Sequence, residues 1–227
     1  EKLAAARQQG SSAVPFDGDY VDASAYGSIG RDANPLDPGD WRGVAPARDS
    51  SWHGTKIAGV IAAAENTDGV AGIAPDAKIQ PVRALSWRGG LLSDIAASIT
   101  WASGGVIDGV PVNETPSQII NMSFAVETMC PNTLQDAIDG AIERGSLLVA
   151  AAGNAGDDAS KFAPANCNGV LTVAASNRDG VRADYSNYGS VVDVSAPGGD
   201  GINPISTTSN DGATTTAAAT VGYDQGT

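Results

Sequence analysis

Five short, mostly apolar runs along the chain constrain its fold more than any other feature of the sequence. The runs span residues 79–85, 118–122, 147–151, 170–174 and 191–195. Near-continuous apolar character over such a length is typical of strands that are buried on both faces of a parallel sheet. We therefore predict five strands at these positions.

Segments with helical periodicity separate these runs. Asp49-Ser50-Ser51 can cap a first helix, which buries Ile57, Val60, Ile61 and Ala64. Ser93 can cap a second helix, which carries Ile95, Ile99 and Trp101. Thr133 can cap a third helix, which carries Leu134, Ile138, Ala141 and Ile142 on one face and ends at Gly145. Strands that alternate with helices predict an α/β protein with a doubly wound, mostly parallel sheet and helices on both faces. We find no linker and expect one domain over 1–227, with 206–220 as a surface loop or extended segment.

The charge of the chain excludes several classes of protein. It has 26 acidic and 13 basic residues, a net charge of −13, and no run of Lys or Arg. A nucleic acid or an anionic membrane surface needs a basic footprint, so we expect neither as a partner. No window approaches the roughly 18 consecutive apolar residues of a membrane-spanning helix.

Two polar residues lie at positions where α/β proteins with a parallel sheet usually have their ligand-binding or catalytic sites. His53 is the only histidine of the chain, and Asn154 follows the predicted strand 147–151. A lone histidine can be catalytic or structural, and an asparagine after glycine can donate to a ligand or form an ordinary turn. The residues by themselves leave both alternatives open.

The context of these two residues resembles a known family. The matching segments, in order, are His53-Gly54-Thr55 with Ile57-Ala58-Gly59, Ile120-Asn121-Met122-Ser123-Phe124-Ala125, Val149-Ala150-Ala151-Ala152-Gly153-Asn154, Tyr185-Ser186-Asn187-Tyr188-Gly189 and Val192-Asp193-Val194-Ser195-Ala196-Pro197-Gly198. They resemble the subtilisin-like serine proteases (subtilases), in particular the secreted bacterial branch. The resemblance covers roughly residues 30 to 227 and implies a secreted serine endopeptidase with a subtilisin-like fold.

The resemblance also implies a role for each matched residue. His53 would act as general base and then general acid, and Asn154 would donate a hydrogen bond to the developing oxyanion. The substrate-binding residues would be Ser123, Phe124, Ala125, Ala152 and Gly153. A protein or peptide substrate would pair with this segment as an added strand.

Two members of the family's catalytic triad have no counterpart here. Their order along the chain in subtilases is Asp, His, Ser. We find no apolar strand that ends in the family's aspartate before His53, and the sequence ends at Gly226-Thr227, one residue before the serine of the family's Gly-Thr-Ser-Met-Ala. We expect this chain to supply His53 and Asn154 only, and to be inactive without a remaining fragment of the same protease as partner.

A calcium site and a disulfide complete the predictions. Asp32, Asp37 and Asp40 lie close enough in sequence to share a calcium ion, which takes carboxylate and carbonyl oxygens. The alternative is a solvated acidic surface. Cys130 and Cys167 could be a disulfide or two thiols; the family resemblance favours a disulfide between two walls of the cleft.

Two other functions compete with the protease. A subtilase-like domain could bind extended peptides without cutting them. A nucleotide-binding protein is disfavoured, because Gly153-Asn154-Ala155-Gly156-Asp157-Asp158 lacks the third glycine of the dinucleotide motif and places two carboxylates where a phosphate would bind.

Overall fold

A computed structural model describes residues 39–43, 46–86 and 89–227. Their contacts divide them into two compact units. Unit 1 consists of the described residues up to Ile95 together with Ser206–Tyr223, and unit 2 consists of Ala96–Ile205 and Asp224–Thr227. We describe each unit by itself, and the expectation of one domain over the whole chain stays a prediction.

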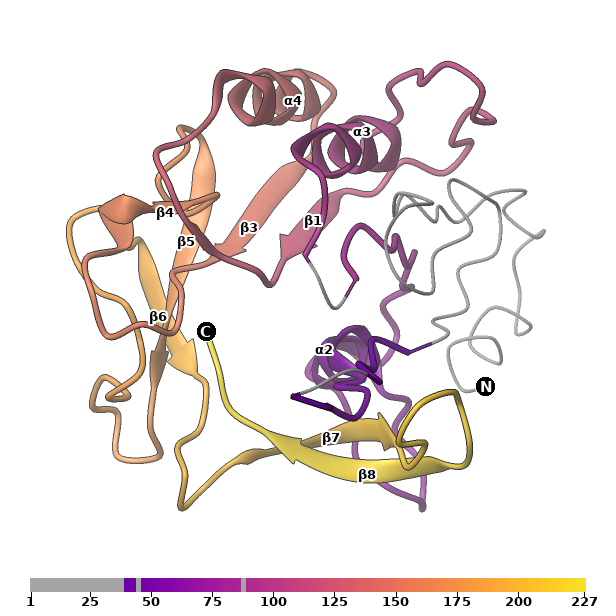
Figure 1. Ribbon diagram of the computed structural model, residues 1–227, viewed down its shortest axis with the longest axis vertical. Helices are drawn as coiled ribbons and strands as arrows, with labels where there is room; N and C mark the ends of the chain where they lie inside the picture. Colours follow the sequence, from indigo (N-terminus) through magenta and orange to yellow (C-terminus); the bar gives the residue numbers. More distant parts are fainter. Residues whose placement is uncertain (1–38, 44–45, 87–88) are drawn as a thin grey trace. The chain divides into compact units, whose positions relative to one another are not determined.

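Unit 2 is built on a parallel sheet. Its strands are β1 (Ile119–Met122), β3 (Leu147–Ala151), β5 (Val170–Ser176) and β6 (Val194–Pro197), in the order β1-β3-β5-β6 (Figure 1). Every neighbouring pair is parallel. Leu148 and Ala150 of the central strand β3 are buried. The parallel α/β architecture predicted from the apolar runs is confirmed.

Two helices follow the predicted apolar faces closely. In α3 (Leu92–Ala102) the Trp101 side chain is fully buried, and α4 (Asn132–Glu143) buries Leu134, Ile138 and Ala141, whereas Ile142 of the predicted face is exposed. Gly145, with φ at +94°, follows the end of α4 as predicted. The predicted caps were wrong, because α3 begins before Ser93 and α4 is preceded by Pro131, which places Thr133 inside the helix.

A small two-stranded sheet extends unit 2 beyond the ends of the parallel strands. The antiparallel pair is β2 (Val126–Glu127) with β4 (Phe162–Ala163), and a short 3-10 helix, η1 (Ala159–Lys161), leads into β4. Phe162 and Ala163 are buried.

Unit 1 contains one helix and two paired strands. These are α2 (His53–Ala62), β7 (Ile205–Asn210) and β8 (Ala219–Asp224), of which Ile205 and Asp224 belong to unit 2. The Thr207 hydroxyl donates to the Lys56 carbonyl at 2.6 Å, and the Thr208 hydroxyl donates to the Thr55 carbonyl at 2.9 Å. At Gly59 a Cβ would collide with the Thr208 hydroxyl. These contacts explain why Gly59 is the buried residue of α2.

Several expectations were wrong in or near unit 1. Trp52, with φ at +53°, directly precedes α2, and two residues of the predicted buried face, Val60 and Ala64, are exposed. Residues 79–85 form no strand, and Pro81 has no N–H to donate to a ladder. Within 206–220, expected to lie outside the core, the Thr207 side chain is buried.

Strand β6 begins three residues later than the apolar run 191–195 predicts. None of the helices that the structure describes is long and apolar enough to span a lipid bilayer.

Candidate active site

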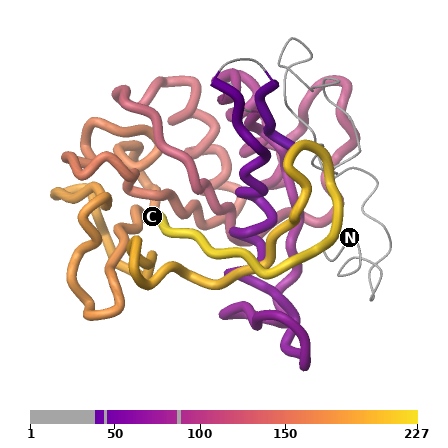
Figure 2. Tube along the Cα trace, turned by 60° about the horizontal axis from the view of Figure 1, so that its bottom comes forward, coloured from indigo at the N-terminus to yellow at the C-terminus, as the bar shows by residue number. Residues whose placement is uncertain are grey.

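The candidate site lies in unit 2, where the carboxyl ends of β1 and β3 meet the last residues of the chain. The arrowheads of both strands point toward the end of the chain (Figure 1), and the yellow C-terminal segment ends beside the orange part of the trace (Figure 2). The Gly226 N–H donates to the Gly198 carbonyl at 3.1 Å, which ties this segment to the loop that follows β6. Ligands of open parallel sheets bind at this edge.

Asn154 is held by Thr227. The Asn154 Oδ1 accepts from the Thr227 N–H and the Thr227 hydroxyl, both at 3.0 Å. The Gly153 N–H donates to the Thr227 Oγ1 at 3.1 Å. Asn154 is exposed, and among the described residues no group accepts from its Nδ2. The Asn154 side chain therefore presents an N–H donor to solvent beside Gly226-Thr227.

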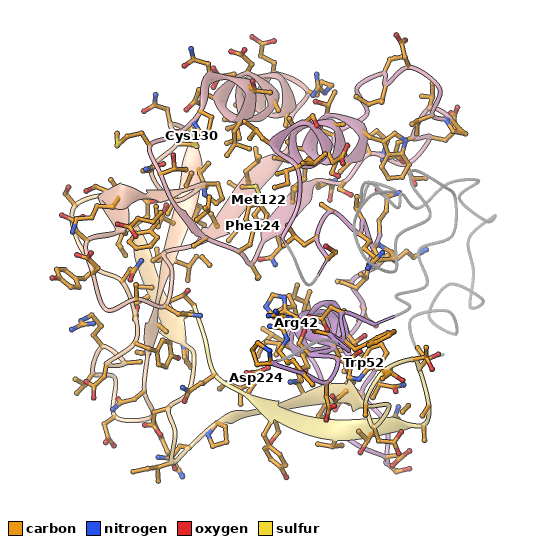
Figure 3. All side chains as sticks on the ribbon, viewed as in Figure 1. Arg42, Trp52, Met122, Phe124, Cys130 and Asp224 are labelled. Atoms are coloured by element: carbon orange, nitrogen blue, oxygen red, sulfur yellow. A yellow bond between two sulfur atoms is a disulfide. The ribbon has the colours of Figure 1, made fainter. Side chains whose placement is uncertain are left out.

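The predicted substrate-binding residues come together around Gly153. Met122 and Phe124 lie at and just beyond the end of β1 (Figure 3). The Asn121 amide donates to the Ser123 hydroxyl at 2.8 Å. A Cβ at Gly153 would lie 3.3 Å from the Cβ of Ala125, so the two predicted walls are adjacent.

Ala152 and Gly153 differ from Ser123, Phe124 and Ala125. Ala152 is fully buried, its N–H donates to the Val173 carbonyl, and its carbonyl accepts from the Asn187 amide. Gly153 is buried as well, with its N–H on the Thr227 hydroxyl and its carbonyl accepting from the Asn187 N–H. Since the backbone groups of both residues are paired inside the protein, we expect Ala152 and Gly153 to support the wall rather than to bind a substrate.

Tyr185 was not given a role by the sequence. Its hydroxyl lies 2.9 Å from the Gly198 carbonyl oxygen, 2.8 Å from that of Gly199 and 3.4 Å from that of Gly226. Partial burial raises the pKa of this phenol, so it stays protonated and can donate to these carbonyls. In the sequence, Tyr185 was singled out only as part of the subtilase-like motif 185–189.

Two carboxylates, those of Asp157 and Asp158, lie beside the site. Lys161 contacts both Asp157 oxygens at 2.8 Å and holds the pKa of that carboxyl below its ordinary value. Hydrogen bonds from Ser160 lower the pKa of Asp158 in the same way. Both groups therefore remain ionised at neutral pH, which disfavours a phosphate ligand and supports the exclusion of a nucleotide site.

The predicted disulfide is present. Cys130 and Cys167 are bonded, with their Cα atoms 5.2 Å apart, and Figure 3 labels Cys130 just before α4. The Asn166 amide beside it donates to the Thr128 carbonyl at 2.9 Å. The bridge and this hydrogen bond join the loop after β2 to the loop after β4.

Removing this disulfide is expected to destabilise unit 2. The bridge spans a sequence separation of 37, for which the loss of chain entropy in the unfolded state corresponds to about 4 kcal/mol, less any strain. The Cys130→Ser, Cys167→Ser double variant should show this as a lower denaturant midpoint, with a slope no smaller than that of the wild type because the unfolded chain without the bridge exposes more surface. A midpoint equal to that of the wild type would contradict it, and the wild type under reducing conditions is the matched control.

In unit 1, His53 is the exposed first residue of α2. Its N–H donates to the Ser51 hydroxyl at 3.3 Å. Ser51 in turn donates to Asp40 from its N–H at 2.5 Å and from its hydroxyl at 2.8 Å. A chain of hydrogen bonds thus connects Asp40 with the start of α2. Because His53 and Asn154 belong to different units, their convergence stays a prediction.

The calcium prediction falls partly outside the described residues, where Asp32 and Asp37 lie. The Asp40 carboxylate is bonded to Ser51 and to the Arg48 guanidinium, 3.1 Å away. These donors contact both oxygens and tie Asp40 to the start of α2, and calcium binding by Asp32, Asp37 and Asp40 stays a prediction. Over 39–43, 46–86 and 89–227, no group of three or more His, Cys, Asp or Glu residues could hold a metal ion.

Comparisons with known proteins agree with this geometry. The model of the Subtilase family matches residues 25–227. An extracellular protease from Xanthomonas campestris pv. campestris is 48% identical over 205 residues, 87% of this chain and 35% of that protein. An extracellular basic protease from Dichelobacter nodosus is 46% identical over 179 residues, 74% of this chain and 30% of that protein.

Solved structures give the same result. A protease from Pseudoalteromonas arctica has a TM-score of 0.84 at 46% identity, over 87% of this chain and 61% of that one. A cold-adapted subtilisin-like serine proteinase has a TM-score of 0.61 at 26% identity, over 86% of this chain and 58% of that one. The chain thus spans about a third of the length of the curated relatives named above and about three fifths of these two structures.

Proposed function

This chain belongs to the subtilase family, and on that basis we propose that it works as a serine endopeptidase in which it supplies the general base and the oxyanion donor. His53 is the base, Asn154 is the donor, and Ser123, Phe124 and Ala125 hold the substrate. In this proposal the aspartate and the nucleophilic serine come from the rest of the protease.

The proposed reaction follows from these roles. His53 takes the proton of the serine hydroxyl as the serine oxygen adds to the carbonyl carbon of the scissile peptide bond. The carbonyl oxygen becomes an oxyanion, to which the Asn154 Nδ2 donates. His53 then returns the proton to the leaving amine, and a water molecule repeats the sequence to release the acyl group.

One observation carries this proposal: the hydrogen bonds that join Asn154 to Thr227. In the family's Gly-Thr-Ser motif the nucleophile comes directly after the residue that corresponds to Thr227. A serine at the next position would therefore start within a residue's length of the amide that is expected to stabilise its oxyanion.

The substrate class follows from the exposed segment beyond β1. An extended peptide can add to this segment through main-chain hydrogen bonds, which depend little on the side chains of the substrate. The relatives are named as extracellular proteases, and we propose secretion for this chain also.

A serine-directed fluorophosphonate probe tests the proposal. The full-length protein should be labelled at a single serine and should cleave an unfolded protein substrate, with both activities abolished by prior treatment with an unlabelled fluorophosphonate. Binding of the unfolded protein without labelling or cleavage would instead support the non-catalytic peptide-binding domain.

Structural calcium is common in subtilases, and we propose that Asp32 and Asp37 contribute to a site in this protein. If they do, adding EGTA should lower the midpoint of thermal unfolding, and restoring excess calcium should raise it again, because a ligand bound only to the folded state stabilises it. An unchanged midpoint would remove calcium from the proposal, and magnesium in place of calcium is the control.

A further inference from the structure

Besides Thr227, the segment 185–188 makes many of the hydrogen bonds that hold the loop that carries Asn154. Residues 152–157 form no helix or strand, so their backbone groups need partners elsewhere. The Gly156 N–H donates to the Tyr185 carbonyl at 2.8 Å, and the Asp157 carbonyl accepts from the Tyr188 N–H at 3.0 Å. The segment 185–188 is therefore the support on which the Asn154 loop lies.

Asn187 makes most of the remaining contacts with its fully buried side chain. Its Oδ1 accepts from the N–H groups of Ala155, at 2.9 Å, and Asp157, at 3.1 Å. Its Nδ2 donates to the Ala152 carbonyl at 2.9 Å, and its own N–H donates to the Gly153 carbonyl at 2.9 Å. These partners lie on both sides of Asn154 in the sequence.

The chemistry of these contacts requires a short amide. One group must accept from two N–H donors and donate to a carbonyl at the same time, which a neutral amide can do and a carboxylate or an apolar side chain cannot. The requirement extends to Gly153, whose φ is +106°, since a Cβ there would collide with the Asn187 amide. The close approach of Asn187 thus explains the glycine that precedes Asn154.

We propose that Asn187 is the positioning residue that fixes the Asn154 loop so that the Asn154 amide is aimed at the oxyanion. This inference rests on the proposed function. Asn187 does not touch the substrate; it acts through the loop that carries the donor.

The expected effect is on turnover. A misplacement of about 1 Å at a reacting centre can cost about 10²-fold in rate. We therefore expect Asn187→Ala to lower kcat by about 10- to 100-fold. The oxyanion exists only in the transition state and its intermediates, so KM should change little.

A double-mutant cycle in the full-length protein separates positioning from general stability. Once Asn154→Ala has removed the donor, Asn187→Ala should lower kcat far less than it does in the wild type, because the two residues act as a unit.

The matched control is Asn113→Ala. The buried Asn113 side chain donates to the Trp101 and Ala102 carbonyls at 3.2 Å and accepts from the Thr115 N–H at 3.0 Å.

A second variant covers the case in which Asn187→Ala fails to fold. Asn187→Asp keeps the shape and can still accept from the Ala155 and Asp157 N–H groups, but it loses the donor to the Ala152 carbonyl and places a carboxylate oxygen against that carbonyl. Because this repulsion opens the loop more often, the variant should also lower kcat with KM nearly unchanged, and hydrogen exchange of the peptide that contains Ala155 and Asp157 should become faster than in Asn113→Ala.

The outcomes distinguish this inference from the proposed function. A wild-type protein without cleavage or fluorophosphonate labelling would overturn the proposed function and the role of Asn187 with it. An active wild type in which the effects of Asn187 and Asn154 variants on kcat simply multiply, or in which Asn187 variants raise only KM, would overturn the role of Asn187 alone.

Discussion

Replacing His53 with alanine is expected to abolish proteolysis almost completely, with kcat lowered by about 10⁶-fold, the magnitude measured for the corresponding histidine of subtilisin itself. As His53 is the only histidine of the chain, no other imidazole in it can take over proton transfer. The measurement is the initial rate of peptide hydrolysis under saturating substrate. The rate of fluorophosphonate labelling should fall as well, because the serine would lose its base.

Stability provides the control for this variant. His53 is exposed at the start of α2, and its described hydrogen bond to Ser51 is made by the backbone N–H. A substitution at such a surface position usually changes the free energy of unfolding by no more than about 0.5 kcal/mol. A His53→Ala protein with wild-type stability and near wild-type kcat would contradict the assignment of His53 as the base.

Replacing Asn154 with alanine is expected to lower kcat by about 10²- to 10³-fold while KM stays nearly constant, the effect known for removing the oxyanion donor of subtilisin. The reason is that the Nδ2 donor acts on charge that develops only after the substrate has bound. Asn154→Asp should lower kcat at least as much, since a carboxylate offers no donor and repels the oxyanion. Steady-state kinetics on a peptide substrate measures both parameters.

An exposed asparagine elsewhere in unit 2 is the matched control. Asn168 lies beside the disulfide, where its backbone N–H donates to Gln135 at 2.8 Å. Asn168→Ala should leave kcat and KM unchanged. An Asn154→Ala protein that keeps wild-type kcat, or whose loss is entirely in KM, would show that Asn154 is a turn residue.

The strands illustrate how far local sequence determines this fold. The run 147–151 predicts β3 with its observed bounds, because all five residues are apolar and Leu148 and Ala150 are buried in the sheet. The run 79–85 also contains Gln80, Pro81 and Arg83 and forms no strand, although Arg83 makes an isolated β-bridge. Hydrophobicity is a local property, whereas strand pairing depends on residues distant in the sequence.

The helix caps failed for a related reason. One of Asp49-Ser50-Ser51 was expected to precede α2 directly, but Trp52 takes that place in a left-handed conformation. The Ser51 hydroxyl accepts from the first N–H of the helix, that of His53, at 3.3 Å while it donates to Asp40. A serine or threonine predicts that a helix begins nearby, while the exact first residue depends on which tertiary partners compete for the hydroxyl.

By itself the sequence determined the α/β class, the parallel strands of unit 2 and most of the buried faces of α3 and α4, because apolar periodicity is written along the chain, and its motifs carried the resemblance to the subtilases. Only the tertiary structure showed that Thr227 bonds to Asn154, that Cys130 and Cys167 are joined, and that Asn187 supports the Asn154 loop from 32 positions away. Hydrogen bonds and disulfides between distant residues leave no periodic trace in a sequence, since each depends on a pair of positions that folding alone brings together.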